Sequence, residues 1–494
     1  MEQLLYSSEV FKAAQKTPRG FTQVRKITLQ DVLLFMIFRH LNTLNQEISA
    51  FFGDLNRERV SRQAMFKAML KVNPAVFRVL IRAFYVQYVT TYEYYRLYDG
   101  YYLLAVDGSH FDLPSSDDAR KTFGGQINKK GQDIHDVPTP QARTSMLYDV
   151  LNHVVLDCVV QPYDVSETDM LYQHLEACRD ILRGKKVIIL ADRYYGSGEL
   201  FLYCKKMGYS FVIRGKVNFY KELTKDIERS KVITLSFNDA WIKRMRNETC
   251  KQYAAEIGYQ CDVRVIKNTF SYMFENKEES SDGIYYVSSE LTSITDKEVV
   301  KIYHGRRWKI ETGYFNLKSH LEAENLNSGI ASIIECETYA KYVALVLGGV
   351  IFNEATAKAE HPSSGKTASS NEPPPVNSSE TSASSVGRRS HFRSQNKYTY
   401  KINMKNVLDT MRLDPFVLRS ISRALPLSNQ ELLDFQERFI PGCLLEKVAI
   451  REGRHIRRWN RWKGSLPRRK FRVDGRRNPP IDRCKTGNGY VTRK

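Results

Sequence analysis

Three carboxylates stand out in the sequence because of where they occur. Asp107 follows the apolar run Tyr101–Val106, and Asp192 follows a second such run, Lys186–Ala191. Proteins of the α/β class present their chemistry where strands of this kind end. An aspartate at a strand end is also a frequent turn former, so each position alone leaves both interpretations open. The third carboxylate, Glu311, lies further along the chain in a helical stretch.

Glu311 shares its predicted helix with two basic residues. At about 100° per residue, Arg307, Glu311 and Lys318 fall within about 40° of one another. The adjacent apolar stripe consists of Ile310, Tyr314, Leu317 and Leu321. This pattern predicts a helix that buries the stripe against a sheet and carries the three polar side chains along the edge of that face. The alternative is an i, i+4 salt bridge on a solvated surface, which the neighbouring Trp308 makes less favourable.

Two aspartates and a glutamate beside Arg and Lys match the needs of phosphodiester chemistry. Mg²⁺ prefers carboxylate oxygens, and two ions about 3.5–4 Å apart can activate water or a 3′-hydroxyl and stabilise the leaving oxygen. Arg307 would hold a phosphate by a bidentate fork, and Lys318 would act as a point charge. The sequence contains no P-loop, no G-x-S-x-G, no H-E-x-x-H and no dinucleotide fingerprint, so other reaction classes have little support.

The charge of the chain indicates a polyanionic partner. Lys and Arg number 75 against 55 Asp and Glu, and +13 of the net +20 lies in the 44 residues from Arg451 to Lys494. Trp459, Trp462 and Phe471 are interspersed there, a pattern typical of a phosphate-binding arm whose aromatic rings stack on bases. The alternative is a solvated tail that serves solubility. Charge alone does not distinguish a protein that cuts nucleic acid from one that reads or coats it.

Composition and length exclude several classes of protein. The 494 residues, 42% of them apolar, are enough for about three domains and exclude wholesale disorder. The longest uncharged apolar run, Tyr342–Phe352, is shorter than the roughly 20 residues that cross a bilayer, and the first residues lack the regions of a secretory signal. The eight cysteines form no C-x-x-C pair, which indicates a reducing compartment and no cysteine-built zinc site. We therefore expect a soluble intracellular protein with no membrane partner.

The elements that must position the carboxylates follow an α/β order. Strands are expected at 101–106, 145–151, 154–160, 186–191 and 209–213, with helices at 166–182 and 198–206 between the last three. Ser166 is expected to cap the first of these helices. Three strands, a helix, a strand, a helix and a strand is the order of a ribonuclease-H-like sheet.

The flanking segments have different patterns. Residues 217–300 contain short alternating stretches at 232–237, 252–259, 262–267 and 284–288, which predict a β-rich insertion. Helices are expected at 303–326 and 334–357, and helical structure again at 398–440. Between 361 and 387, seventeen of 27 residues are Ser, Thr, Pro or Gly, a composition typical of a flexible linker.

Residues 1–98 are predicted to be helical. Asp31 is expected in the first turn of one helix, and Ser61 is expected to cap another that carries Arg62, Gln63 and Lys67. A helix, a turn and this second helix could form a helix-turn-helix DNA reader. A packed helical bundle has the same periodicity, so the pattern leaves both possibilities open.

Three motifs together resemble the DDE transposases of cut-and-paste bacterial insertion sequences. They are Ala105–Ser109 (AVDGS), Ala191–Tyr195 (ADRYY) and the segment R-x-x-x-E-x-x-x-x-x-x-K from Arg307 to Lys318. The match is to the group-four insertion-sequence family, whose third-carboxylate helix carries the Y-R-E-K signature, and it covers roughly residues 20–358. The resemblance implies a ribonuclease-H-like catalytic core with a β-rich insertion before the glutamate.

The resemblance also implies roles for individual residues. Asp107, Asp192 and Glu311 would be the catalytic metal ligands for two Mg²⁺ ions, with Mn²⁺ as a substitute, and Arg307 and Lys318 would contact the terminal phosphates of the transposon end. The signature tyrosine, expected three residues before the arginine, falls on His304, with Tyr303 one residue earlier, and Tyr194 stands where the family usually has a glycine. A tryptophan of the insertion can stack on a flipped base in related enzymes. The further candidate DNA-binding residues are Tyr303, His304, Arg193, Arg62, Gln63, Lys67 and Trp241.

These features predict a DNA transposase. It would bind double-stranded DNA at the terminal inverted repeats of its element, pair the ends in a homodimer, free a 3′-hydroxyl by strand cleavage and join it to target DNA in the bacterial cytoplasm, at the nucleoid. A catalytically silent, transposase-derived DNA-binding regulator and a ribonuclease-H-like nuclease without strand transfer are the alternatives. The predicted divisions are a helical DNA-binding domain (1–98), the first part of the core (99–216), the insertion (217–300), the second part of the core (301–358), the linker (359–397), a C-terminal helical region (398–450) and the basic tail (451–494).

Overall fold

The computed structural model describes residues 2–450 apart from residues 24, 41, 127–138, 217–218, 275–276, 361–391, 394–398, 424–426 and 446. The predicted basic tail and the Ser- and Pro-rich stretch 361–387 lie outside the described residues. Within the described part of the chain, no helix is both long and apolar enough to cross a membrane.

The N-terminal region is helical, as predicted. Its helices are α1 (Glu2–Leu5), α2 (Ser8–Ala14), α3 (Leu29–Phe38), α4 (Leu44–Asp54), α5 (Arg62–Met69) and α6 (Ala75–Thr91). The side chain of Thr28 caps α3 and Asp31 returns the interaction, forming a capping box, while Ser61 caps α5 by accepting from the backbone N–H of Ala64. Both predicted helix starts are therefore confirmed, and each satisfies backbone donors that would otherwise lack partners.

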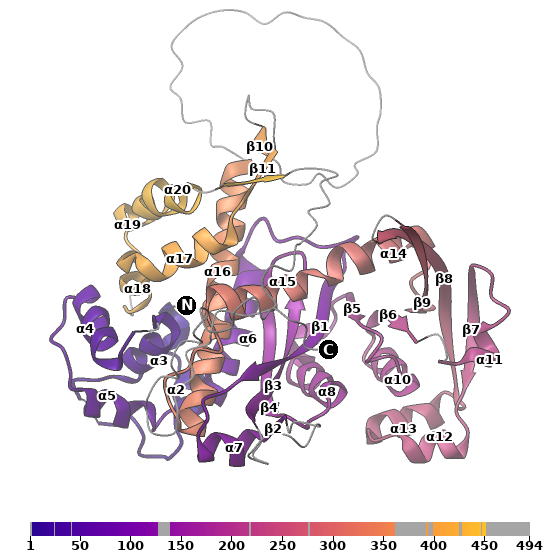
Figure 1. Cartoon of the computed structure of the whole chain (residues 1–494), viewed down its shortest axis with the longest axis horizontal. Coiled ribbons are helices and arrows are strands. Elements are labelled where there is room, and N and C mark those ends of the chain that lie inside the picture. The colour runs from indigo at the N-terminus through magenta and orange to yellow at the C-terminus, as the bar shows by residue number, and fades with distance from the viewer. Residues whose placement is uncertain are drawn as a thin grey trace, which may run out of the picture.

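A mixed sheet lies at the centre of the molecule (Figure 1). Within the described residues it contains β1 (Tyr102–Asp112), β2 (Gly125–Gln126), β3 (Thr139–Asp149), β4 (Val154–Pro162), β5 (Val187–Ala191), β6 (Ser210–Gly215), β7 (Ser230–Ser236), β8 (Gln260–Phe274) and β9 (Lys277–Ser288). β3 pairs antiparallel with both β1 and β4, whereas β1, β5 and β6 are parallel neighbours. The predicted hairpin and the predicted order of strands in the core are confirmed.

The sequence predicted the helical segments after β4 and after β5, but not the helix that follows β1. α7 (Asp117–Phe123) follows β1, α8 (Glu167–Ala177) and α9 (Arg179–Leu182) join β4 to β5, and α10 (Gly198–Lys206) joins β5 to β6. Ser166 caps α8 by accepting from the backbone N–H of Thr168. These helices return the chain to the same end of the sheet, so that β5 and β6 run parallel to β1.

The insertion contains helices as well as strands. β9 pairs with β6, and β8 and β7 continue outward from it, so the insertion extends the central sheet (Figure 1). Between its strands lie α11 (Lys221–Thr224), α12 (Asp239–Arg244) and α13 (Glu248–Glu256). The prediction of an extended stretch at 252–259 is wrong, because Asn247 caps a helix whose buried residues Cys250 and Ala254 have the spacing of one helical turn.

The segment that carries Glu311 is a helix interrupted by two wider turns. It consists of α14 (Asp296–Ile302), the π-helical turn η1 (Tyr303–Arg307), α15 (Lys309–Phe315) and a second π-helical turn, η2 (Asn316–His320). A π turn places one more residue between hydrogen-bonded groups than an α turn does, and such turns occur frequently at functional sites. Both π turns hold basic residues that the sequence singled out.

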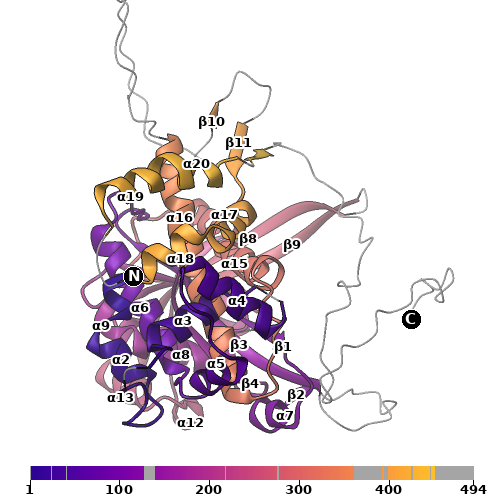
Figure 2. The same cartoon turned by 90° about the vertical axis from the view of Figure 1, so that its left-hand side faces the viewer.

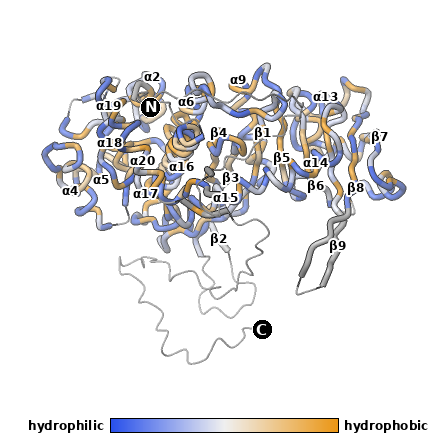
Figure 3. The backbone as a smooth tube through the Cα atoms, turned by 90° about the horizontal axis from the view of Figure 1, so that it is seen from above, coloured by the Kyte–Doolittle hydropathy of each residue, from blue (hydrophilic) through white to orange (hydrophobic). Residues whose placement is uncertain are grey.

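The long helix α16 (Ala331–Glu360) links the N-terminal helices to the sheet. It packs against β4, α3 and α6, and its apolar residues surround it on all sides, as in a helix buried in a large core. Gly349 permits a close approach, because a Cβ atom there would lie 2.3 Å from the carbonyl oxygen of His153. Figure 3 shows hydrophobic residues along α16 and the central strands, with hydrophilic stretches near α4 and β7 at the two ends.

A C-terminal layer covers α16 on the side of the N-terminal helices (Figure 2). It contains the helices α17 (Met404–Leu413), α18 (Pro415–Ile421), α19 (Asn429–Asp434) and α20 (Ile440–Cys443) and the π-helical turn η3 (Phe435–Phe439). A small antiparallel sheet of β10 (Phe392–Arg393), β11 (Thr399–Ile402) and β12 (Lys447–Ile450) lies beside them. The prediction of helical structure at 398–440 is confirmed except at its start, which is β11.

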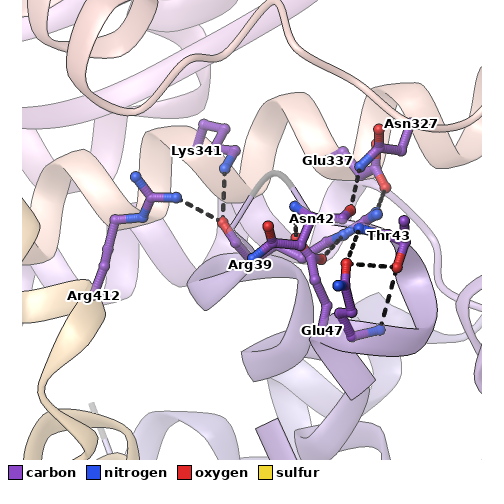
Figure 4. A network of polar contacts seen from close by, with 9 residues as sticks. Arg39, Asn42, Thr43, Glu47, Asn327, Glu337, Lys341 and Arg412 are labelled. Carbon is purple, nitrogen blue, oxygen red and sulfur yellow. Dashed lines mark hydrogen bonds and ion pairs between the residues drawn. The ribbon is translucent and has the colours of Figure 1, made fainter. Parts of the chain in front are cut away.

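Buried ion pairs join these three layers (Figure 4). The guanidinium of Arg39, at the end of α3, binds Glu47 of α4 and Glu337 of α16. Its carbonyl oxygen accepts hydrogen bonds from Lys341 of α16 at 3.2 Å and from Arg412 of α17 at 2.9 Å. One residue thus anchors the N-terminal helices, the core helix and the C-terminal layer to one another.

Lys341 is expected to make the stability of this junction depend on pH. Burial, with the charges of Arg412 and Arg39, lowers the pKa of Lys341 to about 7, whereas in the unfolded chain it is about 10.4. Between these values the unfolded chain binds a proton that the folded chain does not, so stability rises with pH, by at most about 1.4 kcal/mol per pH unit. Melting temperatures measured from pH 7 to 9 should therefore rise, and the rise should be smaller in Lys341→Met. Equal pH dependence in both proteins would contradict this prediction.

Candidate active site

β1 and β5 bring two of the three predicted carboxylates together. The last paired residues of these strands are Ala105 and Leu190, and Asp107 and Asp192 each lie two residues further along. The prediction that Asp107 ends its strand is wrong, because β1 continues to Asp112 in antiparallel pairing with β3. Asp107 instead lies where β1 continues past the end of β5, and Asp192 directly follows β5.

Backbone hydrogen bonds orient both aspartates. The N–H of Gly108 donates to Oδ1 of Asp107 at 2.9 Å, and the N–H of Tyr194 donates to Oδ1 of Asp192 at 2.7 Å. The second of these is the bond of an Asx turn, so Asp192 also forms the turn that the sequence allowed. Each bond fixes one carboxylate oxygen relative to the backbone.

Arg307 joins Glu311 to Asp107. Its Nη2 donates to Oε1 of Glu311 at 2.8 Å, and its Nη1 lies 3.8 Å from Oδ2 of Asp107. The hydroxyl of Tyr314, one turn after Glu311, donates to the carbonyl oxygen of Asp107 at 2.8 Å, which fastens the helix to β1. The i, i+4 ion pair exists, but on a face where the Arg307 side chain is only 13% exposed.

The electrostatics of the site centre on Asp107. Burial raises the pKa of Asp107 to about 7; the charges of Asp192 and Glu167 add to this rise, and that of Arg307 opposes it. A carboxylate surrounded by like charges is stabilised in its ionised form by a nearby cation.

The donor chemistry of these residues fits a divalent metal ion. Asp107, Asp192 and Glu311 offer carboxylate oxygens, the hard ligands that Mg²⁺ and Mn²⁺ accept, and the mutual repulsion at Asp107 is of the kind that a cation offsets. Within the described part of the chain, no three His, Cys, Asp or Glu side chains are grouped closely enough to hold a metal ion. Arg307 occupies the space between two of the three carboxylates, so metal binding requires this guanidinium to move.

The carboxylate of Glu167 lies near Asp107 and was not among the predicted residues. It lies in the first turn of α8, and its charge acts on Asp107. Glu167 follows the predicted cap Ser166, and acidic residues are common in the first turn of a helix. Its type and position in the sequence therefore did not indicate a role in the site. Only the packing of α8 over β1 brings it to the site.

Lys318 contacts the backbone of β1 and a carboxylate outside the predicted set. Its ammonium group donates to the carbonyl oxygen of His110 at 2.6 Å and lies 3.6 Å from Glu324. Lys318 lies within the π turn η2, where the residue spacing differs from that of the regular helix assumed in the prediction. It reaches the strand that carries Asp107, three residues further along.

The other candidate residues near Glu311 have different environments. Tyr303 is buried, and the guanidinium of Arg307 lies 5.4 Å from the centre of its ring. His304 is exposed, and its Nε2 lies 2.6 Å from the hydroxyl oxygen of Tyr285. Arg193 is exposed directly after Asp192. The π turn η1 thus places Tyr303, and not His304, against the arginine.

The candidate residues of α5 lie in the N-terminal region. Arg62, Gln63 and Lys67 are exposed, while Met65, Ala68 and Met69 of the same helix are buried. Arg62 also lines a cavity of about 540 Å³ between α5 and the core, whose wall includes Asn42, Ser116 and Asn327. α5 therefore packs as a bundle helix does and still presents a polar face.

Trp241 lies in α12 at the far side of the insertion. Its ring stacks on that of Tyr220 with centroids 5.6 Å apart, and meets Phe237 edge to face at 6.2 Å. The side chain is part of an aromatic cluster and is half-buried. Its contacts are those of a packing residue.

A buried polar chain supports the site from below. The hydroxyl of Ser145 on β3 donates to the carbonyl oxygen of Asp107 at 3.2 Å, and Nε2 of His174 lies 3.0 Å from the same hydroxyl. Nδ1 of His174 lies 2.7 Å from Oδ2 of Asp157. All three side chains are fully buried, so this Ser–His–Asp arrangement positions the backbone of β1 and is not open to a substrate.

Comparison with known proteins gives the family of the chain. A cryo-EM structure of a piggyBac transposase synaptic complex with hairpin DNA aligns over 88% of this chain and 84% of its own, at 11% sequence identity and a TM-score of 0.38, values too low to support an argument. No curated protein matches. The family described as the transposase DDE domain matches residues 98–347, half of the chain and the part that holds all three predicted carboxylates. The chain therefore belongs to the transposase DDE domain family.

Proposed function

We propose that the protein is a cut-and-paste DNA transposase in which Asp107, Asp192 and Glu311 form the catalytic site. The observation that carries this proposal is that Arg307 contacts both Glu311 and Asp107, while Asp107 and Asp192 leave adjacent parallel strands at the same level. Asp192 and Glu311, which lie 85 and 204 positions after Asp107 in the sequence, are thereby brought to the same region of the fold. The family supports a DNA-cleaving or DNA-joining enzyme.

The three carboxylates would hold two divalent ions, Mg²⁺ or, as a substitute, Mn²⁺. Such ions activate a water or a 3′-hydroxyl and stabilise the leaving oxygen of a phosphodiester. Arg307 would release Glu311 and turn its bidentate fork to the phosphate of the DNA end. Lys318 would leave the carbonyl oxygen of His110 and add a point charge at the neighbouring phosphate. Asp107 and Asp192, fixed by backbone hydrogen bonds, would keep their positions through both cleavage and joining.

Two features of the fold support the finer assignment to a ribonuclease-H-like core of the Y-R-E-K group. The spatial order β4-β3-β1-β5-β6, with three antiparallel strands followed by two parallel ones, has the arrangement expected of such a core. Tyr303 packs against Arg307 through the π turn η1, so we assign the signature tyrosine to Tyr303 although it lies four residues before the arginine. His304 would then contact DNA only from the exposed side of the helix.

The remaining parts would serve DNA binding and assembly. We propose that the N-terminal helices, with Arg62, Gln63 and Lys67 on α5, recognise terminal inverted repeats, and that Arg193 and the basic tail hold DNA less specifically. A homodimer would pair the two ends, at the nucleoid of a bacterial cell. Trp241 would have to leave its aromatic cluster to stack on a flipped base, so this role requires the insertion to rearrange on DNA.

The two alternatives make different demands on the same protein. A silent regulator would bind the inverted repeats and leave DNA intact, whereas a nuclease would cleave DNA and never join it. Incubation of the full chain with DNA that carries an uncut element end, target plasmid and Mg²⁺ separates all three. Joined products whose insertions are flanked by short target duplications support the transposase, cleavage without joining supports the nuclease, and binding alone supports the regulator.

Removal of the basic tail should weaken DNA binding and reduce its dependence on salt. Residues 451–494 carry sixteen basic and three acidic side chains, and removing one phosphate contact lowers the slope of log K against log salt by about 0.9. Fluorescence anisotropy at several salt concentrations measures this slope for the full chain and for the deletion. A variant with Ala at Trp459, Trp462 and Phe471 is the matched control, since it keeps the charge and should keep the slope. An unchanged slope in the deletion would contradict the phosphate-binding role.

A further inference from the structure

The carboxylate of Glu167 lies directly over the backbone beside Asp107. A Cβ atom on Gly108 would lie 2.5 Å from Cδ and 2.7 Å from Oε1 of Glu167. A side chain at position 108 would therefore require the carboxylate of Glu167 to move. Because Gly108 has no side chain, the carboxylate of Glu167 can occupy the space beside the backbone that follows Asp107.

The surroundings of Glu167 are those of the site and not of a surface helix. The charge of Asp192 acts on Glu167, and the charges of Glu167 and Asp192 both act on Asp107. The charges of the same three carboxylates act on the buried hydroxyl of Tyr195 and raise its pKa, which burial raises most. Its contact with Glu167 lacks regular hydrogen-bond geometry, and among the described residues the hydroxyl has no other partner. A buried polar group without a regular partner thus lies within the electrostatic reach of these carboxylates.

The position of Glu167 is fixed from the opposite end of its helix. His174 lies seven residues further along α8, on the same face, and is fully buried between Asp157 and Ser145. Ser145 in turn donates to the carbonyl oxygen of Asp107. The same hydrogen-bonded chain therefore sets the positions of α8 and of the β1 residue that Glu167 approaches.

Glu167 also differs from Glu311 in that no basic side chain forms an ion pair with it among the described residues. Glu311 is held by Arg307 at 2.8 Å, whereas within the described residues Glu167 has no ion pair, and Arg143 acts on it only through its charge. A carboxylate without an ion pair beside Asp107 and Asp192 adds repulsion to the site. A bound cation would offset this repulsion.

We propose that Glu167 is a fourth carboxylate of the catalytic site, which holds a divalent metal ion together with Asp107 and Asp192. This inference rests on the proposed function, because it assigns a further ligand to the same metal-dependent site. Because the described side chains are not grouped closely enough to hold an ion as they stand, this binding requires the Glu167 side chain to turn toward Asp107 and Asp192.

Direct metal binding tests this inference without relying on activity. Mn²⁺ is titrated into the full chain and free Mn²⁺ is followed by electron paramagnetic resonance. The wild-type protein is compared with Glu167→Gln, Asp107→Asn and the control Glu176→Gln, an exposed residue of the same helix. Glu167→Gln should weaken Mn²⁺ binding by about tenfold or more, Asp107→Asn should weaken it similarly, and Glu176→Gln should not change it. Glu167→Asp, which keeps the charge, should lose less than Glu167→Gln.

The outcomes separate this inference from the proposed function. If Asp107→Asn weakens Mn²⁺ binding and Glu167→Gln does not, the fourth ligand is refuted and the metal-dependent site stands. If the wild-type protein and all variants bind Mn²⁺ equally weakly, both proposals fail. Thermal melting of each variant shows whether the chain is folded. Should Glu167→Gln be unfolded, the comparison is made with Glu167→Asp, for which binding equal to that of the wild-type protein would overturn the inference.

Discussion

Glu311→Gln should abolish DNA cleavage and leave DNA affinity within about threefold of the wild-type protein. The substitution keeps the size of the side chain and removes one carboxylate from the proposed metal site, without changing the basic surfaces that bind phosphates. If the Glu311 carboxylate contributes about 4 kcal/mol of transition-state stabilisation as a metal ligand, its loss lowers the cleavage rate by about 10³-fold. Cleavage of labelled element ends and anisotropy on the same DNA measure the two quantities.

The matched control for this prediction is Glu176→Gln. It makes the same chemical change in another helix and also breaks an ion pair with an arginine, Arg179, but on an exposed surface. Its cleavage rate should equal that of the wild-type protein. Cleavage by Glu311→Gln within about tenfold of the wild-type rate would show that Glu311 is only the ion-pair partner of Arg307.

Asp157→Asn should strongly destabilise the folded protein. Asp157 is fully buried and accepts hydrogen bonds from Arg78 at 2.6 and 3.2 Å and from Arg82 at 2.8 Å, besides its contact with His174. Although burial opposes ionisation, the hydrogen bond with His174 and the charge of Arg78 lower the pKa of Asp157 to about 2. Removing one partner of such a buried set leaves the others uncompensated, at a cost of about 3–5 kcal/mol.

Chemical denaturation followed by tryptophan fluorescence measures this loss. Asp180→Asn is the control, because Asp180 pairs with Arg183 on the surface, where such a pair contributes about 0–1 kcal/mol. A loss below about 1 kcal/mol in Asp157→Asn would mean that the buried polar chain does not hold β1, β4 and α6 together. It would also remove the support that we assign to the backbone of Asp107.

Local patterns in the sequence were sufficient to predict most of the core. The capping residues Ser61 and Ser166, the place of Asp31 in a first turn and the apolar runs around β1 and β5 depend on short-range chemistry, and the structure has them where the sequence indicates. The extended stretch predicted at 252–259 failed because a helix of nine residues with two buried positions has too few apolar residues to show its period. The two π turns were not predictable, since a helix with 3.6 residues per turn was assumed throughout.

The site was predictable only in the residues whose neighbours in sequence were informative. Asp107, Asp192 and Glu311 follow apolar strands or share a helix with Arg307, and these patterns are visible without a structure. Glu167 has no such pattern, because its proximity to Asp107 depends on how α8 crosses the sheet and on the missing side chain at Gly108. The same holds for Lys318, which contacts the backbone of β1 from within the turn η2.

The most direct test of metal-dependent transposase chemistry follows strand nicking in a plasmid that carries the gene with its own flanking DNA. Purified protein is incubated with Mg²⁺, with EDTA in place of Mg²⁺, and as the Glu311→Gln variant, and the nicks are mapped to single nucleotides. We expect nicks at the boundaries of the element that require Mg²⁺ and disappear in the variant. Nicking that persists in EDTA or in the variant, or tight binding without any nick, would contradict metal-dependent chemistry at Asp107, Asp192 and Glu311.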